Sequence, residues 1–234
     1  ALAASALPGG MPYYLLAVRE STTTAQTPQA LHELGLAEVA RLRQAMQRVL
    51  AQAGLAGKPA DAIAALRADP RQYYERGEDM LRDYRDIAKR VDAELPRLFA
   101  ELPRTPYGIR AMEAYEGDKA EYYVAGALDG SRAGVFVANA HSLATRPKFE
   151  MENTFLHEAV PGHHLQAARA QEIRDLPRFR RAAGFVAYDE GWALYAESLG
   201  PALGLYRDPA SLLGALAWEM VRACRLVVDT GLHA

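Results

Sequence analysis

The chain has 234 residues, half of them hydrophobic and 24% charged, with a formal net charge of −2. This balance is typical of a folded globular protein, and the length suits one large domain or two small ones; we expect a single domain over residues 1–234. A slightly acidic chain without a dense run of lysine and arginine lacks the charge that tracks a phosphate backbone, so we expect no nucleic-acid partner. Cys224 is the only cysteine. An intrachain disulfide and a cysteine-based zinc site are therefore excluded, and any metal site must use histidines and carboxylates.

The hydrophobic segments of the chain are all short. The first seven residues, Ala-Leu-Ala-Ala-Ser-Ala-Leu, are small and apolar but lack basic residues and a long hydrophobic stretch, so they do not form a complete signal peptide. No apolar run approaches the roughly 18 to 20 residues that a membrane-spanning helix needs. We expect no membrane span, and these patterns leave the cellular compartment and the oligomeric state open.

Two amphipathic helices are predicted in the first half of the chain. Apolar residues recur at spacings of three and four over residues 28–53, behind a Thr27-Pro28 pair that suits an N-cap and a first helical position. A second apolar stripe runs from Tyr73 to Val91, so a second helix is expected to follow Asp69-Pro70. Prolines then interrupt the chain at Pro96, Pro103 and Pro106.

The pattern changes to strands between residues 120 and 143. Two runs rich in β-branched and aromatic residues flank Asp129-Gly130-Ser131, which predicts an antiparallel hairpin. After Pro147 the periodicity is helical again, and we expect three helices, over residues 150–174, 177–199 and 208–228. The predicted fold is mainly α, with a small antiparallel β element.

The segment from His157 to His164 concentrates three of the six histidines and one carboxylate in eight positions. A metallohydrolase helix normally carries His-Glu-x-x-His, because a spacing of four places two imidazoles on one face with the glutamate beside them. Here Pro161 stands where the second histidine belongs. Proline cannot donate the helical hydrogen bond to the carbonyl of His157, so with Gly162 beside it the helix should kink or unwind.

An ideal helix brings neither later histidine to His157. His163 would point about 120° away, and His164 would return to the same face about 10 Å further along the axis. A kink could bring one of them round, and geometry does not decide which. The alternative is that these polar residues only cap a bent helix.

A second polar segment, Tyr188 to Glu197, follows on the next predicted helix. Glu190 and Glu197 are seven residues apart and so share a face; one could bind a metal while the other holds a ligand imidazole. An isolated glutamate is far more often a surface residue. Gly191 argues against that reading, because a glycine inside a helix is costly and is best explained by something that approaches the backbone closely.

These residues match the pattern His-Glu-x-x-Pro-Gly-His-x-x-Gln followed by Glu-Gly-Trp-Ala-x-Tyr-x-Glu. The sequence thereby resembles a bacterial family of unknown function that is grouped with the gluzincin, neurolysin-like zinc metallopeptidases. Further similar positions extend along nearly the whole chain: Thr22-Thr23, Leu34-Gly35, Pro106-Tyr107-Gly108, Arg146-Pro147 and Val227 to His233. Members of the family are typically longer, so the chain resembles the catalytic core of a larger protein.

The resemblance implies a zincin-like helical core, a bound Zn²⁺ and hydrolysis of a peptide substrate. By residue-to-residue carry-over it implies His157, His163 and Glu190 as metal ligands and Glu158 as the general base, and it favours His163 over His164. It also makes an exported location in a bacterium plausible.

A hydrolytic site would also need a donor for the developing oxyanion. The candidates are Tyr122, Tyr123, His141 and His164, of which Tyr123 and His164 join Glu158 in the expected catalytic set. The hairpin could bind an extended peptide along its edge, and Arg146 could pair with a substrate carboxylate. The competing hypotheses are a metal-stabilised or peptide-binding module without catalysis, and a helical interaction domain without metal.

Overall fold

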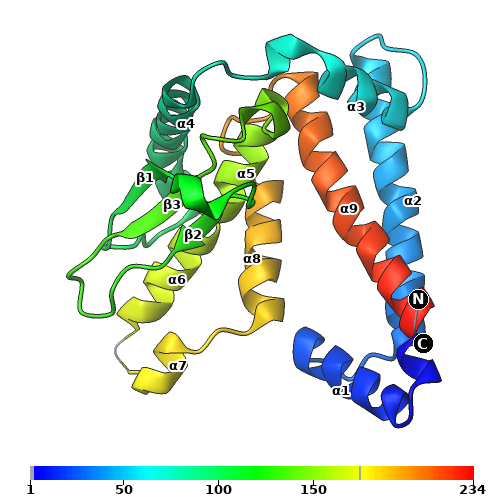
Figure 1. The fold of residues 1–234 in the computed structure, drawn as a ribbon. Coiled ribbons are helices and arrows are strands. Elements are labelled where there is room, and N and C mark those ends of the chain that lie inside the picture. The colour runs from blue at the N-terminus through cyan, green and yellow to red at the C-terminus, as the bar shows by residue number, and fades with distance from the viewer. Residues whose placement is uncertain (1–2, 174) are drawn as a thin grey trace. The chain divides into compact units, whose positions relative to one another are not determined.

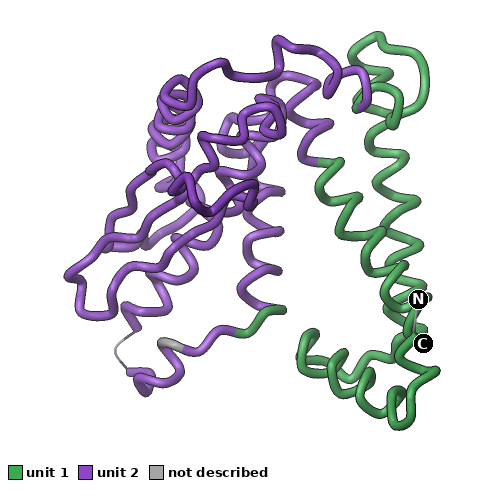
Figure 2. The backbone as a smooth tube through the Cα atoms, in the orientation of Figure 1, with its two compact units in different colours: residues 1–63, 185–187, 216–234 green, residues 64–184, 188–215 purple. Residues whose placement is uncertain are grey.

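The computed structural model describes residues 3–173 and 175–234 and divides the chain into two compact units. The first unit is made of Ala1–Ile63, Phe185–Ala187 and Leu216–Ala234, and the second of Ala64–Gly184 and Tyr188–Ala215 (Figure 2). The prediction of a single domain stays a prediction. Two further predictions fall partly outside the described residues. They are the interpretation of the first seven residues, which includes residues 1 and 2, and the helix that was predicted to end at residue 174.

The first unit is helical and holds its own small core. Its helices are α1 (Gly10–Thr22), α2 (Pro28–Gln52) and the greater part of α9 (Pro209–His233), after a short 3₁₀ turn at Ala4–Ala6 (Figure 1). The predicted start of α2 is confirmed, because the Thr27 side chain accepts a hydrogen bond from the backbone N–H of Ala30. Tyr14 packs in this core and donates to Asp229 over 2.6 Å.

The second unit contains most of the remaining helices and the only sheet among the described residues. Its helices are α3 (Pro59–Ala68, which begins in the first unit), α4 (Gly77–Leu98), α5 (Met151–Glu158), α6 (His163–Glu172), α7 (Arg178–Ala182) and α8 (Val186–Ser198, which also begins in the first unit). Short 3₁₀ turns lie at Pro70–Gln72, Ala114–Glu116, Leu143–Thr145 and Lys148–Glu150. Helices α1 and α3 have no counterpart in the sequence-based prediction.

The second predicted helix starts later than expected. Asp69 caps a single 3₁₀ turn by accepting from the backbone N–H of Arg71, and α4 begins only at Gly77. Tyr73, the first residue of the predicted apolar stripe, lies before α4, and its hydroxyl donates a hydrogen bond to the Arg67 carbonyl. Local side-chain bonds therefore end the turn before a helix can propagate.

The sheet has three strands in the order β1-β3-β2: β1 (Tyr107–Ala111), β2 (Tyr122–Val124) and β3 (Gly134–Ala138). The predicted antiparallel pairing of β2 with β3 is confirmed. The expectation of a purely antiparallel element is wrong, because β1 pairs with β3 in parallel. This strand lies behind Pro106 and finds its partner far along the chain, so local turn signals could not predict it.

The core of the second unit packs α4, α5 and the sheet together. Phe136 of β3 is fully buried and makes edge-to-face contacts with Tyr84 of α4 and Phe155 of α5. These three rings, with Met80, Val91 and Leu156, hold the last turn of α5 in a fixed place.

The predicted helix over residues 150–174 is broken as expected. Helix α5 ends at Glu158 and α6 starts at His163, and the peptide bond between Val160 and Pro161 is cis. A Cβ built on Gly162 would overlap the carbonyl oxygens of Leu156 and His157. Only glycine permits this close return of the chain onto the end of α5.

The last two predicted helices also differ from the structure. The helix predicted over residues 177–199 is divided into α7 and α8, and the helix predicted to end at residue 228 continues for five more residues, to His233. Within the described residues, none of the helices combines the length and the apolar character that crossing a bilayer requires.

We expect Gly162→Ala to lower the free energy of unfolding by about 2 kcal/mol or more, because the added methyl group must displace the backbone of α5. Urea unfolding followed by circular dichroism measures this change. Gly191→Ala is the matched control: a Cβ at Gly191 meets nothing within 4 Å, and alanine is favoured over glycine in a helix by about 1 kcal/mol. Equal effects of the two substitutions would contradict the steric role of Gly162.

Candidate metal centre

The break between α5 and α6 brings two histidines together. His157 lies in the last turn of α5 and His163 is the first residue of α6, and their ring centroids are 4.8 Å apart at 84°. A continuous helix would have pointed these rings about 120° apart. The short turn over residues 159–162 removes that separation, so the structure selects the pairing that spacing alone left open.

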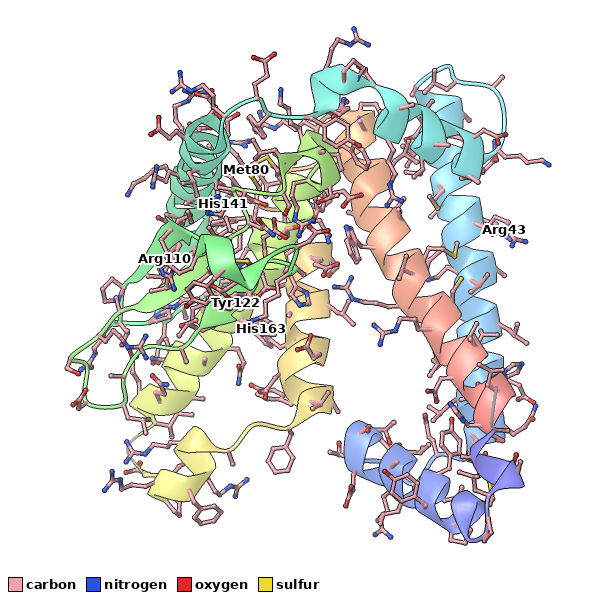
Figure 3. The ribbon with its side chains drawn as sticks, viewed as in Figure 1. Arg43, Met80, Arg110, Tyr122, His141 and His163 are labelled. Atoms are coloured by element: carbon pink, nitrogen blue, oxygen red, sulfur yellow. The ribbon has the colours of Figure 1, made fainter. Side chains whose placement is uncertain are left out.

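Glu190 of α8 completes the cluster. One carboxylate oxygen lies 3.4 Å from Nε2 of His157, and the other lies 3.7 Å from Nε2 of His163, the residue labelled in Figure 3. Among the described residues, these three form the group whose ligand atoms lie within 4.8 Å of one another. Zinc–ligand bonds of about 2.0–2.2 Å at tetrahedral angles place neighbouring ligand atoms about 3.3–3.6 Å apart. The donor types suit zinc, and the 3.4 Å separation lies within this range, whereas the 3.7 Å separation and the 4.8 Å span of the group are wider than a bound ion would set.

Glu197 fixes the orientation of the His157 imidazole. Its Oε1 lies 2.7 Å from Nδ1 of His157, and both side chains are buried. With Nδ1 occupied, His157 presents Nε2 toward His163 and Glu190. A carboxylate behind a ligand histidine is a recurrent feature of zinc sites, where it fixes the tautomer and raises the basicity of the ligand. Glu190 thus lies between the two imidazoles and Glu197 lies behind one of them, whereas metal binding by either arrangement stays a prediction.

The charges around His157 favour its protonated form. Burial alone lowers the pKa of His157, but hydrogen bonds with Glu190 and Glu197 outweigh it and raise that pKa to about 9. Burial, followed by the charge of His157, lowers the pKa of His163. At neutral pH one imidazole therefore carries a proton between the carboxylates while the other is neutral.

Trp192 links α8 to the turn between α5 and α6. Its indole N–H donates to the carbonyl of Pro161 over 2.7 Å. The same helix carries Glu190, so this bond sets the position of Glu190 relative to the two histidines. The small residues Ala193 and Ala196 on the buried side of α8 allow close packing.

Glu158, the predicted general base, ends α5 next to His157. Burial raises the pKa of Glu158 to about 7, against the charge of His157, which lowers it, and with the help of the Glu190 and Glu121 carboxylates, which raise it. A carboxyl group with a pKa near the working pH can both accept and return a proton. The backbone N–H of Tyr123 in β2 also faces this carboxylate.

His164 points away from the cluster, in contrast to His163. Its Nδ1 lies 2.9 Å from the hydroxyl of Tyr123, and only 2% of the residue is exposed. Burial lowers the pKa of His164 to about 4, so the imidazole is neutral at pH 7. The structure therefore brings the two remaining members of the expected catalytic set together, and their role as oxyanion donors stays a prediction.

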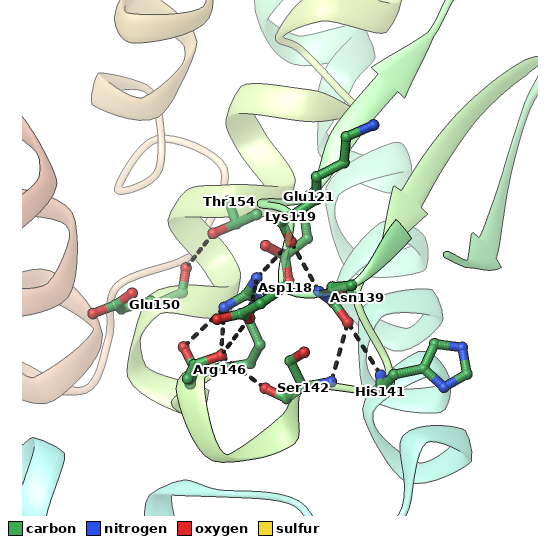
Figure 4. Close-up of polar contacts among 11 residues, drawn as sticks. Asp118, Lys119, Glu121, Asn139, His141, Ser142, Arg146, Glu150 and Thr154 are labelled. Carbon is green, nitrogen blue, oxygen red and sulfur yellow. Dashed lines mark hydrogen bonds and ion pairs between the residues drawn. The ribbon is translucent and has the colours of Figure 1, made fainter. Parts of the chain in front are cut away.

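The other candidates are engaged in the local structure. Tyr122 donates to Glu116 over 2.8 Å, and Nε2 of His141 lies 2.8 Å from the Met112 carbonyl oxygen; both side chains are labelled in Figure 3. Arg146 binds Glu121 over 3.1 Å and the Lys119 carbonyl over 2.6 Å (Figure 4). The guanidinium of Arg146 thus holds the segment before β2, and its pairing with a substrate carboxylate stays a prediction.

Glu121 is a site neighbour that sequence reasoning missed. Its side chain is buried, it forms an ion pair with Arg146, and its charge raises the pKa of Glu158. Asn139, fully buried at the end of β3, anchors the same segment through the carbonyls of Gly117 and Lys119 (Figure 4). A lone glutamate before a strand gives no sequence signal, because its partners come from distant positions.

The surroundings of Gly191 contradict the interpretation that the sequence suggested. A Cβ at this position would meet nothing within 4 Å, so no described residue approaches its backbone closely. The glycine follows Glu190 on an exposed part of α8.

The chain belongs to a bacterial protein family of unknown function, DUF885, whose family model matches residues 1–234. Its structure is similar to the crystal structure of a "putative lipoprotein" from Colwellia psychrerythraea, with a TM-score of 0.92 and 36% sequence identity. The match covers 99% of this chain and 41% of that chain, so the present chain spans about two fifths of the length of that protein. No curated protein matches the sequence. The family and the mainly helical fold with a small sheet are thereby shown.

We expect Glu197→Gln to weaken zinc binding about 10- to 100-fold, because the amide supports the His157 imidazole less well than the carboxylate does. Competition with a chromophoric zinc chelator measures the affinity. Glu78→Gln, which neutralises an exposed carboxylate at the start of α4, is the control. Equal zinc affinities in the two variants would contradict a supporting role for Glu197.

We expect zinc binding at pH 7 to release about one proton, since His157 must give up the proton that its carboxylate neighbours hold. The affinity should rise with pH while His157 loses its proton and level off near pH 9, where its folded-state pKa lies. Calorimetric titration in buffers of different ionisation enthalpy counts the protons. Zinc binding at pH 7 without the release of a proton would contradict the charge state assigned to His157.

Proposed function

We propose that the chain is the catalytic core of a zinc-dependent peptidase. The observation that carries this proposal is the convergence of His157, His163 and Glu190 within 4.8 Å, with the Glu158 carboxylate adjoining them. Three protein ligands leave one position of a tetrahedral zinc ion open, as catalytic sites require, whereas structural sites are closed by four.

A zinc ion held by these residues supplies Lewis acidity, which lowers the pKa of a water molecule and polarises a carbonyl oxygen. Glu158 would accept the proton of the attacking water and return it to the leaving amine, which its pKa of about 7 permits. Glu197 would keep His157 in the binding tautomer, and Trp192 would hold the Pro161 turn and α8 together.

A peptide is the substrate class that the surroundings of the site favour. Among the described residues, β2 is paired on one side only, with β3, and its Tyr123 N–H faces Glu158. An extended peptide can add to such an edge through backbone hydrogen bonds, which would place its carbonyl group beside the base. The similarity to a "putative lipoprotein" agrees with an exported location, which we include in the proposal.

The first test is metal content. After dialysis against metal-free buffer and reconstitution with zinc, inductively coupled plasma mass spectrometry should find about one zinc per chain. His163→Ala should abolish stoichiometric binding. Retention of no zinc by the wild-type chain would contradict the ligand assignment.

The second test is turnover. We expect Glu158→Gln to keep its zinc and to lower the hydrolysis of a mixed peptide library about 10²- to 10⁴-fold, because the amide cannot accept the proton. Mass spectrometry of the library detects the products, and Glu78→Gln serves as the control. Zinc binding without hydrolysis by the wild-type chain would instead favour a metal-stabilised binding module.

A further inference from the structure

The hydrogen bond between Tyr123 and His164 connects the edge strand of the sheet to the helix that carries a metal ligand. Tyr123 lies in β2 and His164 is the second residue of α6, directly after His163. The hydroxyl and Nδ1 are 2.9 Å apart and the rings meet edge to face, with centroids 5.6 Å apart. Successive helical residues point about 100° apart, so one histidine can face the metal position while the next reaches the sheet.

Gly134 leaves the room that this bond needs. A Cβ on Gly134 would overlap the Tyr123 hydroxyl and lie 2.8 Å from Nδ1 of His164. Gly134 does not have a positive φ, so backbone conformation does not explain the glycine. Glycine is required at this position because the Tyr123 and His164 side chains occupy the space of a Cβ.

A second tyrosine packs against the His164 imidazole, from the opposite edge strand of the sheet. Tyr107 of β1 packs against it with centroids 4.9 Å apart and is itself held by a hydrogen bond to Asp92 of α4 over 2.9 Å. His164 therefore contacts both outer strands. The strand β2 pairs with β3 over only three residues, so this side-chain anchor adds substantially to its attachment.

We propose that His164 is a positioning residue: through Tyr123 it anchors β2 to α6, and so holds the Tyr123 backbone N–H beside Glu158 while His163 faces the metal. The catalytic consequence rests on the proposed peptidase function, but the anchoring does not. In this role His164 binds neither metal nor substrate. A displacement of β2 by even 1 Å would misplace the edge along which the peptide lies and the group that orients the base.

Two substitutions of similar size test this role. His164→Asn and His164→Leu remove the same ring, but only asparagine keeps a polar group that can bond the Tyr123 hydroxyl in either direction. We expect both variants to keep one zinc per chain, and kcat/KM for a cleaved peptide to fall about 10- to 100-fold in the leucine variant and only a few-fold in the asparagine variant. Activities are compared well below the melting temperature of each variant.

Two further substitutions break the same bond from its other sides. Tyr123→Phe removes the hydroxyl, and Gly134→Ala fills the space that the pair occupies. Each should lower kcat/KM by itself, and Tyr123→Phe should add little in the His164→Leu background, because groups that act through one bond are not additive.

Hydrogen exchange gives a readout that needs no turnover. We expect the backbone amide of Tyr123 to exchange about 10-fold faster in His164→Leu than in His164→Asn, because β2 opens more readily without its anchor. The amide of Met112, which donates to the Ala138 carbonyl over 2.8 Å, is the internal reference for general loss of stability.

The outcomes separate the inference from the proposed function. Loss of zinc in His164→Leu, or equal Tyr123 exchange in the asparagine and leucine variants, would overturn the anchoring role. A wild-type chain that cleaves no peptide would overturn the peptidase function alone, and the anchoring would then be judged by exchange. Faster Tyr123 exchange with unchanged kcat/KM in a cleaving enzyme would refute the catalytic consequence.

Discussion

The close return of the chain at Gly162 is the constraint on which the candidate metal centre depends. Helix α5 ends at Glu158 because the backbone at Gly162 folds against the carbonyl oxygens of the last α5 turn. This packing lets His163 restart a helix at an angle that a continuous helix would forbid. The two imidazoles meet as a result, and the indole of Trp192 fixes the turn to the helix that supplies Glu190.

The electrostatics of the cluster follow from unequal burial of its carboxylates. Glu197 is buried behind His157, Glu190 is exposed and lies between the two imidazoles, and Glu158 is largely buried beside them. Three carboxyl groups near two imidazoles form a site that attracts a proton or a divalent cation. In the proposed site burial would separate the roles of these glutamates, because the same side chain can support a ligand, bind a cation or exchange a proton according to its surroundings.

The sheet contributes to this site more than its size suggests. It supports α5 through Phe136, and its edge strand reaches Glu158 through the backbone of Tyr123. The segment that leads into this strand is held from two sides, by Arg146 and by Asn139. Together with the bond from His164, these contacts give a three-residue strand a defined position next to the Glu158 carboxylate.

The sequence by itself determined the helical character of most of the chain, the start of α2 and the break at Pro161-Gly162, and it named the three residues that the structure brings together as a possible metal site. Periodicity, capping and proline geometry act within a few residues, so they are visible in the order of amino acids. The choice of His163 over His164 came first from the family pattern and only then from the geometry of the turn. Tertiary structure alone decided the parallel partner of β1, the delayed start of α4, the distinct positions of Glu190 and Glu197, and the attachment of His164 to Tyr123. These features depend on which distant segments pack together, and the free energy of that packing is set by contacts that no local pattern encodes.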